Sequence, residues 1–407
     1  MSQCRVCGRS VELVLDLGSQ PLSDVFPPEP PAAGQEFFYR LQLGRCAGCA
    51  TVQLLEEVPR ERMFGEHYPY RSSGSSVMRT HFSDWAKHLL GTELAGKPDP
   101  FVVELGCNDG VMLGTIAEAG VRHLGVEPSG GIARTAEERG VRVLTAYFEK
   151  ETAAAIAAED GPADVIYAAN TLCHIPYIGS VLDGVSELLT DDGIFVFEDP
   201  YLGDVVAATS FDQIYDEHYF LFSATTVAEL ARRHGLALVD VERLAVHGGE
   251  VRYTLAREGK RPASPAVAEL VAEEAERRLH DPATLAAFAD SVRHNARELI
   301  ALLTRLREDG HTIAAYGATA KSATVTNFCG IGPELVTTVY DTTPEKQGRV
   351  TPGTHIPVSP ASAFDAPYPD YALLFAWNHA AEIMARETEF RERGGRWITY
   401  VPDVRVL

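Results

Sequence analysis

The sequence predicts an α/β protein organised around parallel β-sheets, and three stretches carry this prediction. The apolar run 101–105 ends in a glycine-bearing loop, within FVVELGCNDG, and a helical pattern follows from Val111. The run 123–127 is a second strand candidate, which ends in the acid Glu127. Residues 312–316 form a third candidate, followed by a loop with Gly317 and another helical pattern. Parallel sheets bind ligands at the carboxyl ends of their strands, so these loops mark the expected ligand sites.

Length and charge limit the possible functions. A chain of 407 residues exceeds one typical domain, and we expect three, over residues 1–66, 67–255 and 256–407. The formal charge of −21 disfavours nucleic acid or an anionic membrane as the main partner, but it allows an anionic small substrate. No run is long and apolar enough to span a bilayer, and the amino terminus lacks the apolar core of a signal peptide. We therefore expect a cytoplasmic protein, and the sequence leaves its oligomeric state open.

Two pairs of cysteines near the amino terminus predict a metal site. Cys4 and Cys7 form one C-x2-C pair, and Cys46 and Cys49 form the other. Each pair lets one tight turn direct two thiolates at the same ion, and a set of four thiolates leaves no open position for chemistry. The pairs therefore predict a structural zinc; the alternative is four free thiols in a reducing compartment.

The first loop and the second strand end predict a nucleoside site. Gly106 and Gly110 let the backbone turn sharply and approach a ligand closely, and Glu127 can accept both hydroxyls of a ribose. The loop lacks G-x-G-x-x-G, which makes a dinucleotide the weaker interpretation. Tyr147 and Phe148 are placed to flank an adenine, although core packing suits them nearly as well. The expected cofactor-binding set is completed by Glu104, Asn108, Pro128 and Asn170.

A second cluster predicts proton transfer. Residues 215–218 read Tyr-Asp-Glu-His, and an aromatic run follows them. Neighbouring histidine and carboxylate groups suit proton abstraction, because their environments can separate their pKa values. The alternative is an exposed polar turn before the helix expected from Ala224. His174 follows the strand expected over 163–170, in a loop at the same edge of the sheet. The loop YPYRSSGSS presents further phenols and hydroxyls to a polar ligand: Tyr68, Tyr70, Ser72 and Ser73.

The last part of the chain predicts a second parallel sheet. Long helices over 266–306 precede the strand 312–316, and Lys321 lies at the start of the next helix. Backbone amides at that helix start, together with Lys321, can hold a phosphate. The loop lacks the second and third fingerprint glycines, which argues against a working dinucleotide site. This domain is therefore expected to be either a nucleotide-sugar-binding domain or a scaffold. The candidate substrate contacts beyond Ser72 and Ser73 are His247, Lys321, Asn327 and Asn378.

These motifs occur in one order, and together they resemble a known family. The four cysteines are followed by YPYRSS, ELGCNDG, NTLCHI, YDEH and HGG. The ordered set resembles the S-adenosylmethionine (SAM)-dependent C-methyltransferases of deoxysugar and antibiotic biosynthesis, over essentially the whole chain. The resemblance implies an amino-terminal zinc-binding module, a class I methyltransferase domain with a Rossmann-like sheet, and a carboxy-terminal Rossmann-like domain. It also implies SAM as the methyl donor and a nucleotide-linked 4-keto-deoxysugar as the substrate, with dTDP as the expected nucleotide and C3 as the expected carbon.

The resemblance gives each candidate a role. His218 is the expected base, and Glu217 is expected to orient it. Tyr215 and His174 are expected to stabilise the enolate oxygen, while Tyr68 or Tyr70 contacts the donor or the sugar. The alternative hypothesis is an NAD-dependent oxidoreductase on the carboxy-terminal sheet, with the front half of the chain as a regulatory SAM-binding module. The missing glycines argue against that alternative.

Overall fold

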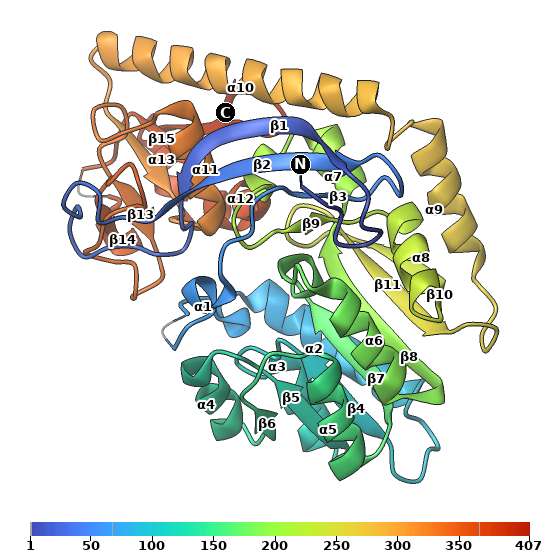
Figure 1. The fold of residues 1–407 in the computed structure, drawn as a ribbon. Helices are drawn as coiled ribbons and strands as arrows, with labels where there is room; N and C mark the ends of the chain where they lie inside the picture. The colour runs from blue at the N-terminus through green and yellow to red at the C-terminus, as the bar shows by residue number, and fades with distance from the viewer. Residues whose placement is uncertain (1, 67, 366) are drawn as a thin grey trace.

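Three β-sheets organise the part of the chain that the structure describes. The computed structural model describes residues 2–66, 68–365 and 367–407. Within these residues one sheet has four strands, one has seven and one has six. Figure 1 shows the seven-stranded sheet in the lower part of the molecule, the six-stranded sheet at the upper left, and the amino-terminal strands, in blue, between them and the long helix above.

The amino-terminal sheet is built into the rest of the molecule. Its strands are β1 (Val11–Pro21), β2 (Phe38–Cys46), β3 (Val52–Leu54) and β9 (Phe220–Leu221). Neighbouring strands are antiparallel throughout. The start of β2 alternates exposed and buried residues, the pattern of a strand with one face in the core. Because β9 follows residues 215–218 directly, this sheet ties the amino-terminal residues to the predicted proton-transfer cluster.

The seven-stranded sheet has the strand order β10-β11-β8-β7-β4-β5-β6. Strands β4 to β8 are parallel, while β11 runs antiparallel to both β8 and β10. The order reverses between β4 and β7, the switch point at which open α/β sheets bind ligands. The strands are β4 (Phe101–Leu105), β5 (Arg122–Val126), β6 (Val143–Leu144), β7 (Ala163–Ala169), β8 (Leu189–Pro200), β10 (Leu236–Leu244) and β11 (Glu250–Arg257).

Helices cover both faces of this sheet, because its central strands are apolar on both sides. On one face, Phe82 of α2 and Leu113 of α3 share a core with Tyr167 of β7. On the other face, Val181 of α6 belongs to a core with Phe195 of β8. The helices are α1 (Arg60–Met63), α2 (Ser76–Gly91), α3 (Val111–Glu118), α4 (Gly130–Glu138), α5 (Lys150–Asp160), α6 (Ile178–Leu188), α7 (Leu202–Ala208) and α8 (Ala224–Arg233), with short 3-10 helices at Ser72–Gly74, Leu172–His174 and Phe211–Gln213.

The six-stranded sheet has the order β14-β13-β12-β15-β16-β17 and is parallel except at β17. Its order reverses between β12 and β15, which creates a second switch point. The strands are β12 (Ile313–Tyr316), β13 (Val339–Asp341), β14 (Val358–Pro360), β15 (Tyr371–Leu374), β16 (Arg396–Thr399) and β17 (Arg405–Val406). The helices are α9 (Pro265–Glu276), α10 (Pro282–Glu308), α11 (Ala320–Cys329), α12 (Ala380–Arg386) and α13 (Thr388–Glu392), with short 3-10 helices at Ala361–Ala363 and Trp377–His379. The α/β architecture predicted from the sequence is confirmed.

Helix α10 joins the domains along one side of the molecule. Asp281 caps the helix by accepting from the amide of Ala283, and Pro282 occupies its first turn. The helix packs against β1, α11 and β12, and Figure 1 shows it running along the top of the molecule. Its apolar stripe recurs at intervals of about three or four residues: Leu285, Phe288, Ala289, Val292, Ala296, Leu299, Leu303 and Leu306.

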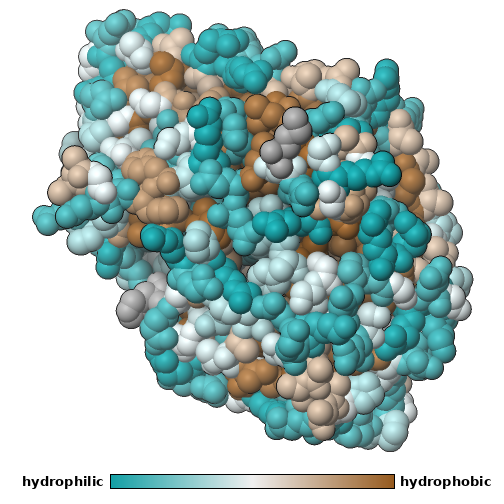
Figure 2. Space-filling view, viewed as in Figure 1, coloured by the Kyte–Doolittle hydropathy of each residue, from teal (hydrophilic) through white to brown (hydrophobic). Residues whose placement is uncertain are grey.

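The outer surface mixes polar and apolar residues. Figure 2 shows hydrophilic residues over much of one face, with apolar side chains interspersed among them. Among the described residues, no helix combines the length and the apolar character that crossing a bilayer requires.

A buried ion cluster fixes α2 to the seven-stranded sheet. Glu198 of β8 accepts from Nε of Arg252 at 2.7 Å and lies 2.6 Å from Nε2 of His81 on α2. The Arg252 guanidinium stacks on the Trp85 ring, 3.7 Å from its centroid. Burial alone would raise the pKa of Glu198, but His81 and Arg252 together hold it below its ordinary value. These contacts anchor α2, and with it the loop that precedes α2.

Candidate active site

A cavity of about 350 Å³ lies where the loops of the two parallel sheets meet. Its walls include Gly106 and Asn170, which follow β4 and β7 at the first switch point. They also include Ala318 and Asn378, which follow β12 and β15 at the second. Two ligand-binding edges therefore share one space, whose volume is within the range of small-molecule sites.

Most of the predicted site residues line this cavity. They come from all three sheets' loops and from the segment before α2. The predicted residues in the wall are Tyr68, Tyr70, Ser72, Gly106, Asn108, Glu127, Pro128, Tyr147, Phe148, Asn170, His174, Tyr215, Glu217, His218, His247, Lys321 and Asn378. Their assembly from distant stretches makes the cavity the candidate active site.

Glu127 lies under the loop that follows β4. One of its carboxylate oxygens accepts from the amide of Asn108 at 3.0 Å, and the other accepts from the amide of Ser129 at 2.8 Å. Burial raises the pKa of Glu127, and the two amides offset that rise only in part. The carboxylate therefore already holds two loops together, and each oxygen retains a further lone pair for a hydroxyl group.

Gly106 occupies a position that a side chain would fill. Its φ is +64°, and a Cβ atom there would lie 2.4 Å from Oγ1 of Thr171. Thr171 follows β7, so the loops after the two switch-point strands touch at this glycine. The sharp turn that the sequence predicted at Gly106 is present, and the space beside its Cα is taken by Thr171, so only glycine fits here.

Tyr147 and Phe148 form an aromatic part of the wall. The guanidinium of Arg60 stacks over Tyr147, 4.0 Å from the ring centroid, and it also lies 4.7 Å from the ring of Tyr177. Phe148 is buried and lines the same cavity. The arrangement suits a flat, uncharged ring such as adenine.

His218 has a tautomer that its partners define. Its Nδ1 lies 2.8 Å from the carbonyl oxygen of Gln213, which can only accept, so Nδ1 carries the proton. Its Nε2 lies 2.8 Å from the hydroxyl of Tyr215, and the neutral ring accepts there. Burial, with additional repulsion from His174 and Lys321, lowers the pKa of His218 well below 6.5. The ring is therefore a neutral base with its lone pair directed at Tyr215.

Glu217 is expected to orient His218, but in the structure it makes no hydrogen bond with that ring. Its carboxylate accepts from the hydroxyl of Tyr68 at 3.1 Å, and His218 is instead oriented by the carbonyl of Gln213. Burial and the nearby Asp216 raise the pKa of Glu217 well above its ordinary range. Tyr215 also differs from expectation, because its hydroxyl donates to His218 and is not free for a substrate oxygen in this state.

His174 sits in a stack of parallel rings. Its ring lies between Phe64, at 5.7 Å and 11°, and His218, at 5.4 Å and 25°. Cys173, His174 and His218 place ligand-type atoms within 4.8 Å of one another. Parallel rings direct their in-plane lone pairs alongside each other rather than at a common point, so this trio fits a metal poorly. Desolvation lowers the pKa of His174 to about 3, and its Nε2 is buried without a hydrogen-bond partner among the described residues.

Two lysines line the side of the cavity that faces the six-stranded sheet, and one of them is paired with an acid. Nζ of Lys321 donates to the carbonyl of His247 at 3.2 Å. Nζ of Lys346 donates to Asp24 at 2.6 Å and to the carbonyl of Ala318 at 3.0 Å. Burial lowers the pKa of Lys321, while Asp212 and Glu250 counteract that effect. The sequence did not indicate Lys346 and Asp24 as site residues, because 322 residues separate them and neither lies in a motif.

Four predicted residues do not line the cavity. Glu104 is buried in β4 beneath the loop, and Gly110 precedes α3 with a φ of +76° where a Cβ would meet Ala136. Ser73 binds Asp109 through its hydroxyl and its amide. Asn327 donates to the carbonyls of Ala323 and Pro352, at 2.8 and 3.1 Å, and so holds the loop at Pro352 instead of lining the cavity.

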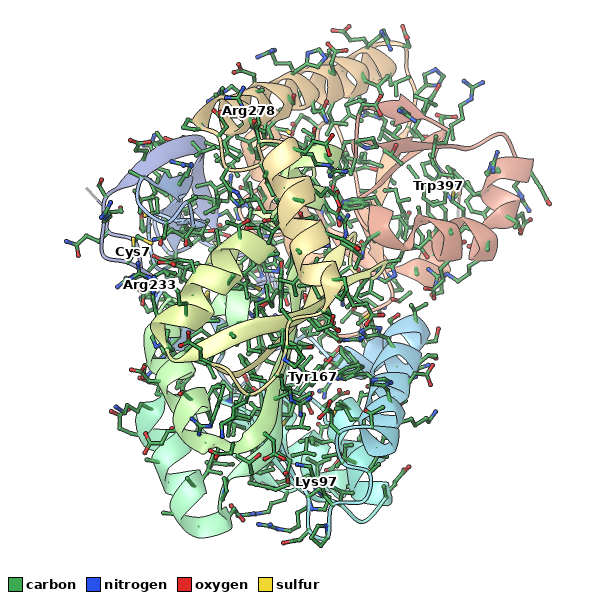
Figure 3. All side chains as sticks on the ribbon, turned by 90° about the vertical axis from the view of Figure 1, so that its right-hand side faces the viewer. Cys7, Lys97, Tyr167, Arg233, Arg278 and Trp397 are labelled. Carbon is green, nitrogen blue, oxygen red and sulfur yellow. The ribbon has the colours of Figure 1, made fainter. Side chains whose placement is uncertain are left out.

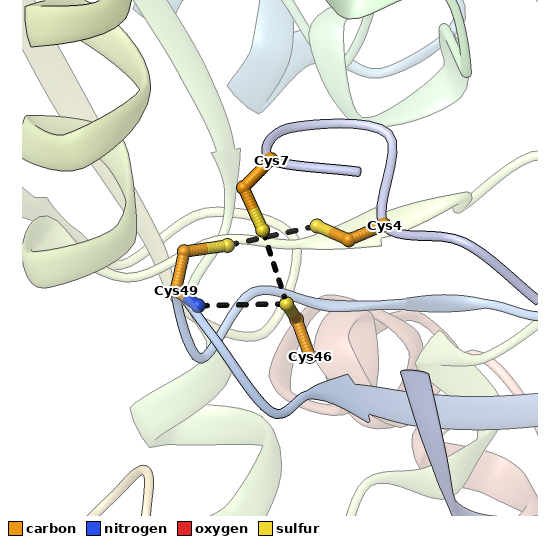
Figure 4. A group of neighbouring side chains, drawn as sticks. All are labelled: Cys4, Cys7, Cys46 and Cys49. Carbon is orange, nitrogen blue, oxygen red and sulfur yellow. Dashed lines mark hydrogen bonds between the residues drawn. The ribbon is translucent and has the colours of Figure 1, made fainter. Parts of the chain in front are cut away.

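Four cysteine sulfurs meet at the ends of the amino-terminal strands (Figure 4). Sγ of Cys4 lies 3.6 Å from Sγ of Cys49, and Sγ of Cys7 lies 3.3 Å from Sγ of Cys46. Tetrahedral zinc with bonds of about 2.3 Å places its sulfurs roughly 3.8 Å apart, so the set fits this ion. The amides of Gly48 and Cys49 donate to Sγ of Cys46, at 3.2 and 3.4 Å, as a thiolate ligand requires.

A positive side chain accompanies the cysteines. Figure 3 shows Arg233, from α8, close to Cys7, and both residues line a small hollow in the surface. Four thiolates around one zinc carry a net negative charge, which a nearby guanidinium partly balances. The cluster lies apart from the lining of the candidate active site, which makes it a structural centre.

We predict that Cys46→Ser removes the bound zinc and destabilises the amino-terminal sheet. Metal analysis should give one zinc per chain for the wild type and substoichiometric zinc for the variant, with a lower melting temperature. Cys329→Ser serves as the matched control, since Cys329 is a free cysteine away from the cluster. Zinc-free wild-type protein with an unchanged melting temperature would contradict the assignment.

Comparison with family models divides the chain into three matched regions. Residues 4–64 match a model described as "Putative zinc binding domain", residues 78–241 match "Methyltransferase domain", and residues 245–402 match "C-methyltransferase C-terminal domain". The first region contains the four cysteines, and the second contains the first switch point.

Known proteins show similarity of different extents. The C-methyltransferase NovU of Streptomyces niveus is 36% identical over 413 residues, which cover 100% of this chain and 97% of NovU. A ubiquinone biosynthesis O-methyltransferase of Cupriavidus pinatubonensis is 30% identical over 190 residues, or 43% of this chain and 73% of that protein. Among solved structures, the magnesium protoporphyrin IX methyltransferase of Synechocystis with bound SAM is 12% identical, with a TM-score of 0.34 over 45% of this chain and 82% of that chain.

The full-length similarity agrees with the motifs and with the architecture. The sequence-based predictions of SAM and of a zinc held by four cysteines are confirmed at this level. The chain belongs to the family of SAM-dependent C-methyltransferases that carry an amino-terminal zinc-binding domain.

Proposed function

We propose that the protein methylates a carbon, expected to be C3, of a nucleotide-linked 4-keto-deoxysugar in deoxysugar and antibiotic biosynthesis. The observation that carries this proposal is the buried neutral imidazole of His218, hydrogen-bonded to Tyr215 in the cavity wall. A C–H bond becomes nucleophilic only after a base removes its proton, and a neighbouring ketone makes that proton acidic. Methyl transfer to oxygen or nitrogen can proceed by positioning alone, so it does not require such a base.

The residues suggest how the proton is moved. In the structure, the Tyr215 hydroxyl donates to Nε2 of His218. Substrate binding turns that hydroxyl toward the ketone oxygen and frees Nε2 to take the proton from the adjacent carbon. Tyr215 then donates to the enolate oxygen, with His174 beside it. The carbonyl of Gln213 then stabilises the positively charged imidazolium of His218, because it already accepts a hydrogen bond from Nδ1.

The methyl donor is proposed to lie at the first switch point. SAM, when bound, would supply an electrophilic methyl group to the enolate carbon and would leave as S-adenosylhomocysteine. The residues that would hold it are Gly106, Asn108, Glu127, Pro128, Tyr147, Phe148 and Asn170, with Glu104 and Gly110 supporting the loop from below. Tyr68, Tyr70 and Ser72 close the wall next to them.

The nucleotide is proposed to lie toward the six-stranded sheet. Lys321 and Lys346 both line that side, and two cations suit a diphosphate such as that of dTDP. His247 and Asn378 would contact the sugar or the phosphates. This placement treats residues 256–407 as a nucleotide-sugar-binding domain, beside a zinc-binding module over 1–66 and a methyltransferase domain over 67–255. An oxidoreductase on this sheet has no observation in its favour.

We predict that Glu127→Ala weakens SAM binding by about 10- to 100-fold, the scale of lost hydrogen bonds to a charged group. Calorimetry with SAM measures this directly. Glu127→Gln should lose less, because its amide oxygen still accepts from one of the two backbone amides. Unchanged affinity in Glu127→Ala would remove Glu127 from the ribose site.

We predict an acidic limb of kcat/KM well below pH 6.5, the ordinary value for histidine. A lowered pKa favours the neutral ring, so His218 remains a base as the pH falls toward that limb. Lys321→Met removes a positive neighbour, which raises the pKa of His218 and moves the limb to higher pH. Circular dichroism at each pH separates this titration from unfolding. A limb that stays in place in Lys321→Met would contradict the electrostatic argument.

We predict proton exchange without methyl transfer. Wild-type enzyme, incubated in D2O with an NDP-4-keto-deoxysugar and S-adenosylhomocysteine, should exchange the proton next to the ketone, as read by NMR. His218→Asn should slow both this exchange and methylation by about 10²- to 10⁴-fold with SAM affinity retained. His174→Asn should lose less, because it removes one contributor to enolate stabilisation.

The matching product assay identifies the substrate. A small panel of such sugars, incubated with SAM, should show one member gaining a methyl group, with its carbon assigned by NMR. Equal exchange in wild type and His218→Asn would move the base to another residue. No methylated member in the panel would contradict the proposed substrate class.

A further inference from the structure

Residues 212–218, the base segment, are held by side chains of the carboxy-terminal domain. The segment carries Tyr215 and His218, which belong to the methyltransferase half of the chain. Oγ1 of Thr324 on α11 donates to the carbonyl of Ile214 at 2.9 Å. The ring of Phe211, just before the segment, lies 5.9 Å from that of Phe328. The segment thus depends on a domain that supplies none of its residues.

Asp212 makes the strongest of these connections. One carboxylate oxygen accepts from Nε1 of Trp377 at 2.6 Å and from the hydroxyl of Tyr400 at 2.7 Å. Trp377 follows β15 and Tyr400 follows β16, so both donors come from the carboxyl edge of the six-stranded sheet. Asp212 is fully buried and does not line the cavity, so it has no direct access to a substrate.

Gln213 links Asp212 to His218. Gln213 follows Asp212, and its carbonyl accepts from Nδ1 of His218 at 2.8 Å. The side chain of Gln213 donates to the carbonyl of His247 at 2.8 Å, and Lys321 donates to the same carbonyl at 3.2 Å. The Gln213 carbonyl, which sets the tautomer of His218, is therefore held by the contacts of Asp212 and by the side chain of Gln213 itself.

We propose that Asp212 is a positioning residue, through which Trp377 and Tyr400 hold the Gln213 carbonyl against Nδ1 of His218. Loss of this connection would let the imidazole rotate or change tautomer, and then Nε2 would no longer present its lone pair to the substrate. The inference rests on the proposed function, because it takes His218 as the base.

The cost of burying Asp212 supports a specific role. A buried carboxylate is expensive unless it is well hydrogen-bonded and balanced by charge. Two hydrogen bonds reach one oxygen, while the other has no partner among the described residues. Burial raises the pKa of Asp212, and Lys321, in the cavity wall, is the cation that offsets part of this rise. An apolar residue would fill the same space without these hydrogen bonds, so the carboxyl group suits the task of orienting two donors.

The test compares Tyr400→Phe and Trp377→Phe with a matched control, Tyr316→Phe. Tyr316 donates its hydroxyl to the carboxylate of Glu387 at 2.8 Å in the same domain, away from the base segment. Tyr400→Phe and Trp377→Phe should each lower kcat by about 10-fold or more, up to roughly 100-fold when both are combined, because small displacements of a base are costly. SAM affinity should stay unchanged, as should kcat in Tyr316→Phe.

A second series separates position from folding. Asp212→Asn retains the shape and one acceptor, so it should recover part of the kcat that Asp212→Ala loses. Adding Tyr400→Phe to Asp212→Ala should cause no further loss, since both changes break the same connection. Equal losses of kcat in Tyr400→Phe and Tyr316→Phe would overturn the proposal, as would additive losses when Asp212→Ala and Tyr400→Phe are combined.

Hydrogen–deuterium exchange provides a readout that does not depend on the substrate. Peptides covering residues 212–218 should exchange faster in Tyr400→Phe than in the wild type, and at the wild-type rate in Tyr316→Phe. Unchanged protection in Tyr400→Phe would overturn the proposal even if kcat falls. A wild type that processes no keto-sugar would contradict the proposed function alone, because this exchange experiment needs no sugar.

Discussion

The hydrogen bond from Nδ1 of His218 to the carbonyl of Gln213 is the constraint around which the site is organised. It assigns the proton to one ring nitrogen and leaves the other as the acceptor for Tyr215. A backbone carbonyl cannot change its protonation state, so the assignment persists over the whole working pH range. The neighbouring contacts, from β9 on one side and from α11 of the carboxy-terminal domain on the other, help to keep this carbonyl in place.

The arrangement of the sheets explains why so many polar groups are buried in one place. Two parallel sheets direct the carboxyl ends of their strands at one cavity, and loops there carry acids, histidines and lysines. Burial of such groups is unfavourable without partners. The Nε2 atoms of His174 and His247, which have no hydrogen-bond partner in the described part of the chain, lie in the wall of this cavity. A ligand with polar groups could form hydrogen bonds with these two atoms, so binding can offset the unfavourable burial at these positions.

The sequence predicted the features that depend on local spacing. Cys4, Cys7, Cys46 and Cys49 form pairs whose geometry follows from two tight turns, and Gly106 needs a left-handed φ at one loop. It could not predict that a carbonyl, which every residue possesses, would orient His218 in place of Glu217. The short strand β9 pairs with β3, which lies far away in the sequence. A strand of two residues has no sequence pattern from which its partner strand could be predicted. Asn327 looked like a ligand contact because side-chain type alone does not reveal which way a helix faces.

The distant zinc site also connects to His218 through the order of the strands. Cys46 ends β2 and Cys49 precedes β3, so the metal fixes the turn between these strands. Leu54, at the end of β3, donates its amide to the carbonyl of Tyr219 at 2.8 Å, one residue after His218. On the opposite flank, the amide of Ser23 donates to the carboxylate of Asp216. A metal outside the cavity can therefore still affect the position of His218, because it stabilises the sheet that is hydrogen-bonded to Tyr219.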